Sequence, residues 1–99
     1  MIIFEYRFDV VPGKMKEFLK YVEQEGRPAW RQFKEVKDLR VLTNVYGVSS
    51  PQRIVQVTLT DMTALEKIFA DEKFQKVRDD FHGLVYNLSH TILTEVPTD

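Results

Sequence analysis

The chain has 99 residues, of which 43% are hydrophobic and 29% charged, and its formal net charge is −1 at pH 7. This length supports one domain with one hydrophobic core, the lack of a basic excess argues against nucleic-acid binding, and the lack of cysteine excludes disulfides and thiolate metal sites. No apolar run is long enough for a membrane span, and strand-like sequence from Ile2 leaves no room for a signal peptide, so we expect a cytoplasmic protein.

The first third of the chain predicts a strand followed by an amphipathic helix. Apolar residues alternate over residues 2–10, the period of a strand with one buried face. Residues 11–13 form a turn, and apolar residues then recur at helical spacing over residues 15–22. Proline removes a donor and constrains the residue before it, so we expect residues 26–28 to interrupt this helix, with a short helical piece after them.

The middle of the chain predicts two paired strands. Residues 39–46 and 53–60 are rich in β-branched and aromatic side chains, and the intervening residues 47–51 read as a turn. The order and spacing are typical of a hairpin.

The last part of the chain predicts a helix in two pieces and a final strand. Asp61 is a candidate N-cap, with the capping box of Thr63 and Glu66 as the alternative. Asp71 offers a second N-cap, so we expect the helix to kink or restart there. Residues 88–96 form the last strand.

The resulting order is strand, helix, strand, strand, helix, strand, in a single domain of residues 1–99. Right-handed crossovers fold this order into a four-stranded antiparallel sheet with two helices on one face, a ferredoxin-like βαββαβ fold of the α+β class. The second and third strands carry apolar residues on both faces, among them Leu42 and Ile54. Two helices cover one face only, so we expect a second copy of the chain to cover the other, as a homodimer.

Four stretches that span nearly the whole chain form a pattern of their own. They are Phe4-Glu5-Tyr6-Arg7, Pro12-Gly13-Lys14 with Phe18-Leu19, Ala70-Asp71-Glu72-Lys73-Phe74, and Leu84-Val85 with Ile92-Leu93. This ordered set resembles the dimeric α+β barrel superfamily and, within it, the NIPSNAP-like proteins. The resemblance implies a homodimer whose sheets face each other and cavities lined by sheet and helices.

The resemblance leaves two functions open. One is a small-molecule enzyme of the cofactor-independent monooxygenase or isomerase kind, acting on a small hydrophobic or aromatic carbonyl compound. The alternative is a non-catalytic dimeric module that binds a metabolite or a protein. The asparagine, tryptophan and histidine set of the superfamily's haem-degrading branch does not map onto this chain, and we expect no cofactor.

The two histidines, His82 and His90, are the candidate proton-transfer residues. His82 lies at a predicted helix C-terminus, where a charged surface histidine is the alternative reading. His90 lies in the last strand, where a hydrogen-bonded core histidine is the alternative. No carboxylates converge on either residue in the sequence, so no metal site is predicted.

The candidate ligand-binding residues are two arginines and a set of aromatic residues. Arg7 and Arg40 fall on the strand face opposite the buried aromatic residues, where they could hold a carboxylate or a polarised carbonyl, or form ion pairs between subunits. The candidate aromatic wall consists of Trp30, Tyr21, Tyr46 and Tyr86. Core packing is the alternative role for these aromatic side chains.

Overall fold

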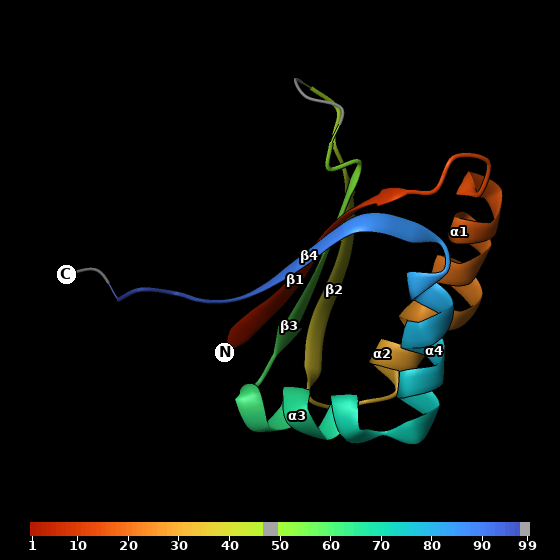
Figure 1. Cartoon of the computed structure of the whole chain (residues 1–99). Coiled ribbons are helices and arrows are strands. Elements are labelled where there is room, and N and C mark those ends of the chain that lie inside the picture. The colour runs from red at the N-terminus through yellow and green to blue at the C-terminus, as the bar shows by residue number, and fades with distance from the viewer. Residues whose placement is uncertain (47–49, 98–99) are drawn as a thin grey trace.

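The computed structural model describes residues 1–46 and 50–97 and confirms the α+β, ferredoxin-like fold. Its strands are β1 (Ile2–Val10), β2 (Val36–Thr43), β3 (Arg53–Leu59) and β4 (Val85–Thr94). Its helical segments are α1 (Met15–Tyr21), η1 (Val22–Gly26), α2 (Arg27–Arg31), α3 (Met62–Ala70) and α4 (Glu72–His82). Figure 1 shows the helical segments gathered on one side of the sheet. Within the described ranges, no helix has the length and apolar character needed to cross a membrane.

The four strands form one antiparallel sheet in the order β2-β3-β1-β4. The central strand β1 has alternate side chains under the helices, and Phe4, Tyr6 and Phe8 are all buried. The register sets Tyr6 opposite Val55 of β3, and Val55 opposite Val41 of β2, so these side chains share the helix-covered face. Each fully buried phenylalanine stabilises the fold by about 1.5–3 kcal/mol relative to an exposed one.

Two aspartates define the ends of the second helical region, as the sequence predicts. Asp61 caps α3, because its Oδ1 accepts a hydrogen bond from the Ala64 N–H at 2.8 Å. Asp71 ends α3 with extended backbone and caps α4, accepting from the Phe74 N–H at 2.9 Å. Each side chain satisfies an N–H that the first helical turn leaves without a backbone partner. The expected restart near Asp71 is therefore confirmed.

The first helical region is continuous, so the predicted interruption at residues 26–28 is wrong. The chain passes from α1 into the π-helical segment η1 and then into α2 without leaving the helical conformation. The Arg27 N–H donates to the carbonyl of Val22, five residues earlier. Pro28 follows in the first turn of α2. The wider winding removes the need for the hydrogen bond that proline cannot make, so the helix accommodates it.

Two strands differ in their ends from those predicted. β2 begins at Val36 rather than residue 39, because the residues from Val36 onward already find backbone partners in β3. β4 begins at Val85 rather than residue 88 and ends at Thr94. An irregularity in the β1–β4 pairing, beside Asn87 with φ 52°, lets the pairing continue to Val85. The expected turn at residues 47–51 includes residues 47–49, which lie outside the described part of the chain.

Asp9 joins three strand ends on the sheet face away from the helices. Its carboxylate accepts hydrogen bonds from Ser50 Oγ at 2.7 Å, the Gln52 N–H at 2.8 Å and Asn87 Nδ2 at 3.1 Å. Gln52 Oε1 in turn accepts from the Val10 N–H at 2.9 Å. The hydrogen bond from Ser50 is the largest influence on the pKa of Asp9, which lies below its ordinary value although burial opposes the shift.

Candidate functional site

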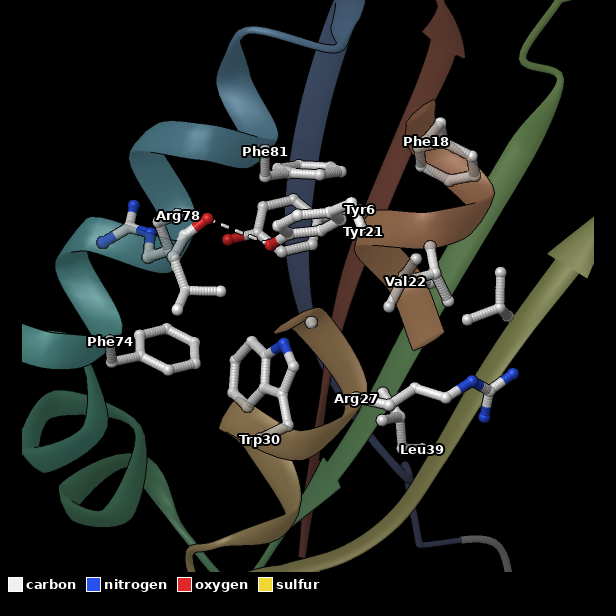
Figure 2. Close-up of a pocket in the computed structure, with 14 residues that line it drawn as sticks. Tyr6, Phe18, Tyr21, Val22, Arg27, Trp30, Leu39, Phe74, Arg78 and Phe81 are labelled. Carbon is white, nitrogen blue, oxygen red and sulfur yellow. Dashed lines mark hydrogen bonds between the residues drawn. The ribbon is translucent and has the colours of Figure 1, made fainter. Parts of the chain in front are cut away.

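A cavity lies between the helix-covered face of the sheet and the helical layer (Figure 2). Tyr6, Leu39, Val41 and Val55 line it from the sheet, and side chains of α1, η1, α2 and α4 line it from the other side. Its volume is about 40 Å³. This is room for about three water molecules, so a larger ligand enters only if the walls move apart.

Aromatic rings make up much of the cavity wall. Trp30 of α2 packs edge to face on Phe74 of α4, with 4.6 Å between ring centroids. Phe81 of α4 lies 5.3 Å from the Tyr6 ring and is stacked at 5.9 Å on the Tyr21 ring. Paired rings of this kind stabilise one another beyond the area that they bury, and they present flat apolar faces to a planar guest.

Tyr6 Oη is the polar atom that the sheet contributes to this apolar space. Tyr6 is 5% exposed, and within the described residues its hydroxyl has no hydrogen bond of acceptable geometry. Burial raises the pKa of the hydroxyl, while the positive charge of nearby Arg78 and its weak side-chain hydrogen bond to the hydroxyl oppose the rise. Over residues 1–46 and 50–97, the buried Nε of Arg78 also makes no hydrogen bond of acceptable geometry, so its contact with the neighbouring Tyr6 hydroxyl is an imperfect one. Since buried polar groups nearly always have partners, the two together mark a place for a ligand oxygen.

Tyr21 forms the neighbouring part of the cavity wall. Its hydroxyl, unlike that of Tyr6, makes a hydrogen bond of good geometry. Its hydroxyl donates to the carbonyl of Val77 at 3.0 Å, the dashed line in Figure 2. Burial raises its pKa, so this hydroxyl stays protonated. Gly26 approaches the ring closely, and a Cβ built on Gly26 would lie 3.0 Å from Tyr21 Cε1. The π-helical segment and its glycine therefore position the tyrosine wall of the cavity.

Two arginines flank the cavity from opposite sides (Figure 2). Arg78 comes from α4, with its Cζ 4.2 Å from the centroid of the Phe69 ring in a cation–π contact. Arg27 begins α2 and extends toward β2, beside Leu39. The other residues of the cavity wall include no carboxylate.

Of the sequence-predicted ligand residues, Trp30 and Tyr21 line the cavity. Tyr46 and Tyr86 lie elsewhere, with 94% and 45% of their surface exposed. Neither residue lines this cavity, and their part in binding a ligand stays a prediction.

Arg7 and Arg40 lie on the opposite face of the sheet, called the open face below. Arg7 Nε donates to Glu5 Oε1 at 2.5 Å, Gln56 Nε2 donates to Glu5 Oε2 at 2.8 Å, and Arg40 donates to Gln56 Oε1 at 2.5 Å. Burial raises the pKa of Glu5, but the hydrogen bonds from Arg7 and Gln56 outweigh it and the net shift is downward. The structure thus brings both arginines into one network across β1, β3 and β2, away from the cavity.

Neither histidine lines the cavity. His82 is exposed at the last residue of α4, beside the Phe81 ring. His90 is exposed in β4, its ring 5.8 Å from that of Phe4, because the helices do not cover this half of the strand. Proton transfer by either residue stays a prediction. Over residues 1–46 and 50–97, no three His, Asp or Glu side chains gather in a way that could hold a metal ion.

Sequence reasoning missed Tyr6, Arg27 and Arg78 as site residues. A signal for Arg78 was present, because it follows Phe74 by four residues and therefore lies on the apolar stripe of its helix. Tyr6 alternates with phenylalanines on the buried face of β1, which places a hydroxyl in the core. For Arg27 no such signal exists, since its direction depends on the π-helical winding before it.

No protein-family model matches the sequence, and no curated protein matches it. Solved structures share its fold. A cofactor-independent oxygenase from Streptomyces nogalater, SnoaB, is 18% identical with a TM-score of 0.82, covering 98% of this chain and 94% of its own. An uncharacterized NIPSNAP domain protein from Burkholderia xenovorans is 20% identical with a TM-score of 0.73, covering 97% and 95%. HapK from Hahella chejuensis is 11% identical with a TM-score of 0.81, covering 100% and 96%.

At these identities the matches establish the fold. They confirm, at that level, the resemblance to NIPSNAP-like proteins that the sequence predicts. They also place the chain beside a cofactor-independent oxygenase in architecture. Function is argued from the site, because one fold can carry many activities.

Proposed function

We propose that the chain is a small-molecule enzyme of the cofactor-independent monooxygenase or isomerase kind, acting on an aromatic carbonyl compound in the cavity beside Tyr6 and Trp30. The observation that carries the proposal is the buried Tyr6 hydroxyl, which lies beside Arg78 in a largely apolar space and, within the described residues, makes no hydrogen bond of acceptable geometry. The shared fold with a cofactor-independent oxygenase supports it.

The chemistry follows from the protonation states of these groups. A tyrosine hydroxyl with a raised pKa stays protonated at neutral pH and can donate to a carbonyl oxygen of the ligand. The charge of Arg78 stabilises the negative charge that develops on that oxygen when the ligand loses a proton beside the carbonyl to a water molecule in the cavity, which carries the proton to solvent. The resulting enolate has an electron-rich carbon, which reacts with O₂ in a monooxygenase or takes a proton at another position in an isomerase.

Anthrone is a suitable probe, because this aromatic ketone reacts with one O₂ to give anthraquinone and one water. We expect the protein to accelerate this reaction above the rate in buffer, measured as oxygen uptake and anthraquinone formed. Tyr6→Phe removes the donated hydrogen bond and should lower kcat by about 10²-fold. Tyr46→Phe removes the hydroxyl of an exposed residue that does not line the cavity and serves as the matched control.

Equal rates for Tyr6→Phe and the unmodified protein would contradict the proposed role of Tyr6. Binding of anthrone with no acceleration by any form of the protein would instead support the alternative function, a non-catalytic binding module.

We further propose that the chain forms a homodimer through its open face. Ile3, Leu42, Ile54 and Leu93 lie on this face by their register in the sheet. Leu42 and Leu93 are 37% and 43% exposed in the single chain, which leaves apolar surface in contact with water. The same face carries two ion pairs, one between Arg7 and Glu5 and the other between Arg40 and Asp38. A two-fold axis would set such a surface against a complementary copy of itself.

A further inference from the structure

Arg27 is a charged group at the cavity wall that the described residues leave unpaired. It is half-buried, yet no hydrogen bond or ion pair links its side chain to another described residue. By contrast, Arg7 and Arg40 each have hydrogen-bonded partners on the open face. A partly buried guanidinium without an anion gives up hydration and gains no charge partner in return.

The π-helical segment explains why Arg27 has no acidic partner in its own helix. Glu23 precedes Arg27 by four residues, a spacing that brings opposite charges together on an α-helix. The segment between them is wound with five-residue hydrogen bonds, and the Arg27 N–H is bonded to Val22. This changes the angle between the two side chains, and Arg27 points toward β2 instead (Figure 2).

The charge of the whole cavity wall has one sign. Fourteen residues line it, of which two are arginines and none is acidic. Low-dielectric walls concentrate the field of such charges, so the cavity attracts anions over neutral molecules of the same shape. Figure 2 places the Arg27 guanidinium and the Tyr6 hydroxyl at separate ends of the space.

We propose that the ligand is an aromatic carboxylate whose anionic group is held by Arg27 at the edge of the cavity, with its ring system among Trp30 and the neighbouring aromatic side chains. This inference rests on the proposed function, since it concerns the ligand of the same cavity. Arg27 acts here as a specificity residue that selects charge. The carbonyl oxygen of the ligand lies at the other end, beside Tyr6 and Arg78.

A matched pair of probes tests this charge selection. 2-Naphthoate and 2-naphthamide have the same ring system and nearly the same shape, but only the first is an anion. The chain has one tryptophan, so the indole N–H signal of Trp30 in an NMR titration reports occupancy of the cavity without ambiguity. The variants are Arg27→Gln and, as control, Arg31→Gln, which removes an exposed arginine one turn later in the same helix.

We expect the unmodified protein to bind naphthoate about tenfold more tightly than naphthamide, a modest preference suited to a half-exposed charge pair. Arg27→Gln should abolish this preference while leaving naphthamide affinity unchanged, and Arg31→Gln should retain it. Equal affinity of the unmodified protein for both probes, or a preference that survives Arg27→Gln, would overturn the inference while leaving the cavity as a binding site. Failure of both probes to move the Trp30 signal would overturn the proposed function as well.

Discussion

Three side chains with buried polar groups, Glu5, Asp9 and Tyr6, differ in how far the protein satisfies them. Both acids have complete sets of partners: Glu5 accepts from Arg7 and Gln56, and Asp9 accepts three hydrogen bonds. Tyr6 has none of acceptable geometry within the described residues. Burying a polar group without a partner costs about 1–3 kcal/mol, and the Tyr6 hydroxyl lies in the cavity, where a ligand could restore the bond.

Asp9→Asn tests how far one buried carboxylate stabilises the fold. The amide nitrogen faces at least one of the donors that now bond the carboxylate, so we expect a loss of about 1–3 kcal/mol in the free energy of unfolding near pH 7. The folded-state pKa of Asp9 is lowered from its ordinary 3.8. Its stabilisation is therefore fully present above that ordinary value and is lost as the pH falls through the lowered folded-state pKa.

Urea unfolding of both proteins between about pH 7 and pH 3 measures this effect. The stability difference between the unmodified protein and Asp9→Asn should narrow as the pH falls below about 4. Asp79→Asn, at an exposed position of α4, is the control and should differ little from the unmodified protein throughout. A difference for Asp9→Asn that stays constant to the lowest pH would contradict the assigned role.

The π-helical segment is the element that most shapes the site. It lets the first helical region pass Pro28 without ending, places Gly26 against Tyr21, and directs Arg27 toward β2. These consequences share one cause, the wider winding between α1 and α2. A regular α-helix would align Glu23 with Arg27 and leave the cavity wall without its unpaired charge.

Gly26→Ala tests the close approach at this segment. Alanine is normally favoured over glycine in a helix by about 1 kcal/mol. Here the new Cβ would lie 3.0 Å from the Tyr21 ring, and overpacking of this kind costs about 1–3 kcal/mol. We therefore expect a net loss of up to about 2 kcal/mol in the free energy of unfolding, measured by urea denaturation.

Gly83→Ala is the matched control for this change. Gly83 has helical backbone with φ −75°, and its nearest contact to a new Cβ is the Asp80 carbonyl oxygen at 3.5 Å. Stability should stay the same or rise by about 0.5 kcal/mol. A Gly26→Ala variant as stable as Gly83→Ala would show that the Tyr21 ring moves away at no cost, contrary to the packing described above.

The whole molecule covers one face of its sheet and leaves the other open. The helices bury the aromatic face of β1, while the open face combines apolar side chains with paired charges. The sheet order places β1 at the centre, so its two faces serve the cavity and the proposed dimer contact at once. If two chains pair in this way, their two sheets pack against each other through the open faces. Each cavity then lies on the side of its own sheet that faces away from the partner.

Leu42→Glu tests the proposed dimer. Leu42 is 37% exposed on the open face, so a glutamate there should cost the single chain little. In the proposed dimer it would bury a charge in an apolar contact, which is strongly unfavourable without a partner. We expect sedimentation velocity to give the mass of two chains for the unmodified protein and of one chain for Leu42→Glu. Gln32→Glu, at an exposed position after α2, should remain dimeric, and an unmodified protein that stays monomeric at high concentration would contradict the proposal.

The sequence by itself determined the element order, the fold and the cap at Asp71, and it offered Asp61 as one of two candidate caps for the preceding helix. These depend on local patterns, because the spacing of apolar residues sets which face of an element is buried and a capping side chain acts within its own turn. Arg7 and Arg40 were also correctly assigned to one face, since side chains alternate along a strand.

Only the tertiary structure decided the ends of β2 and β4, the π-helical passage and the cavity. Strand ends depend on the backbone partners that the neighbouring strand offers, and these are distant in the sequence. Tyr6 and Arg78 meet because β1 and α4 pack at a particular distance and angle. Periodicity shows that a side chain faces the interior, but the polar atoms it will find there depend on how the packed elements meet.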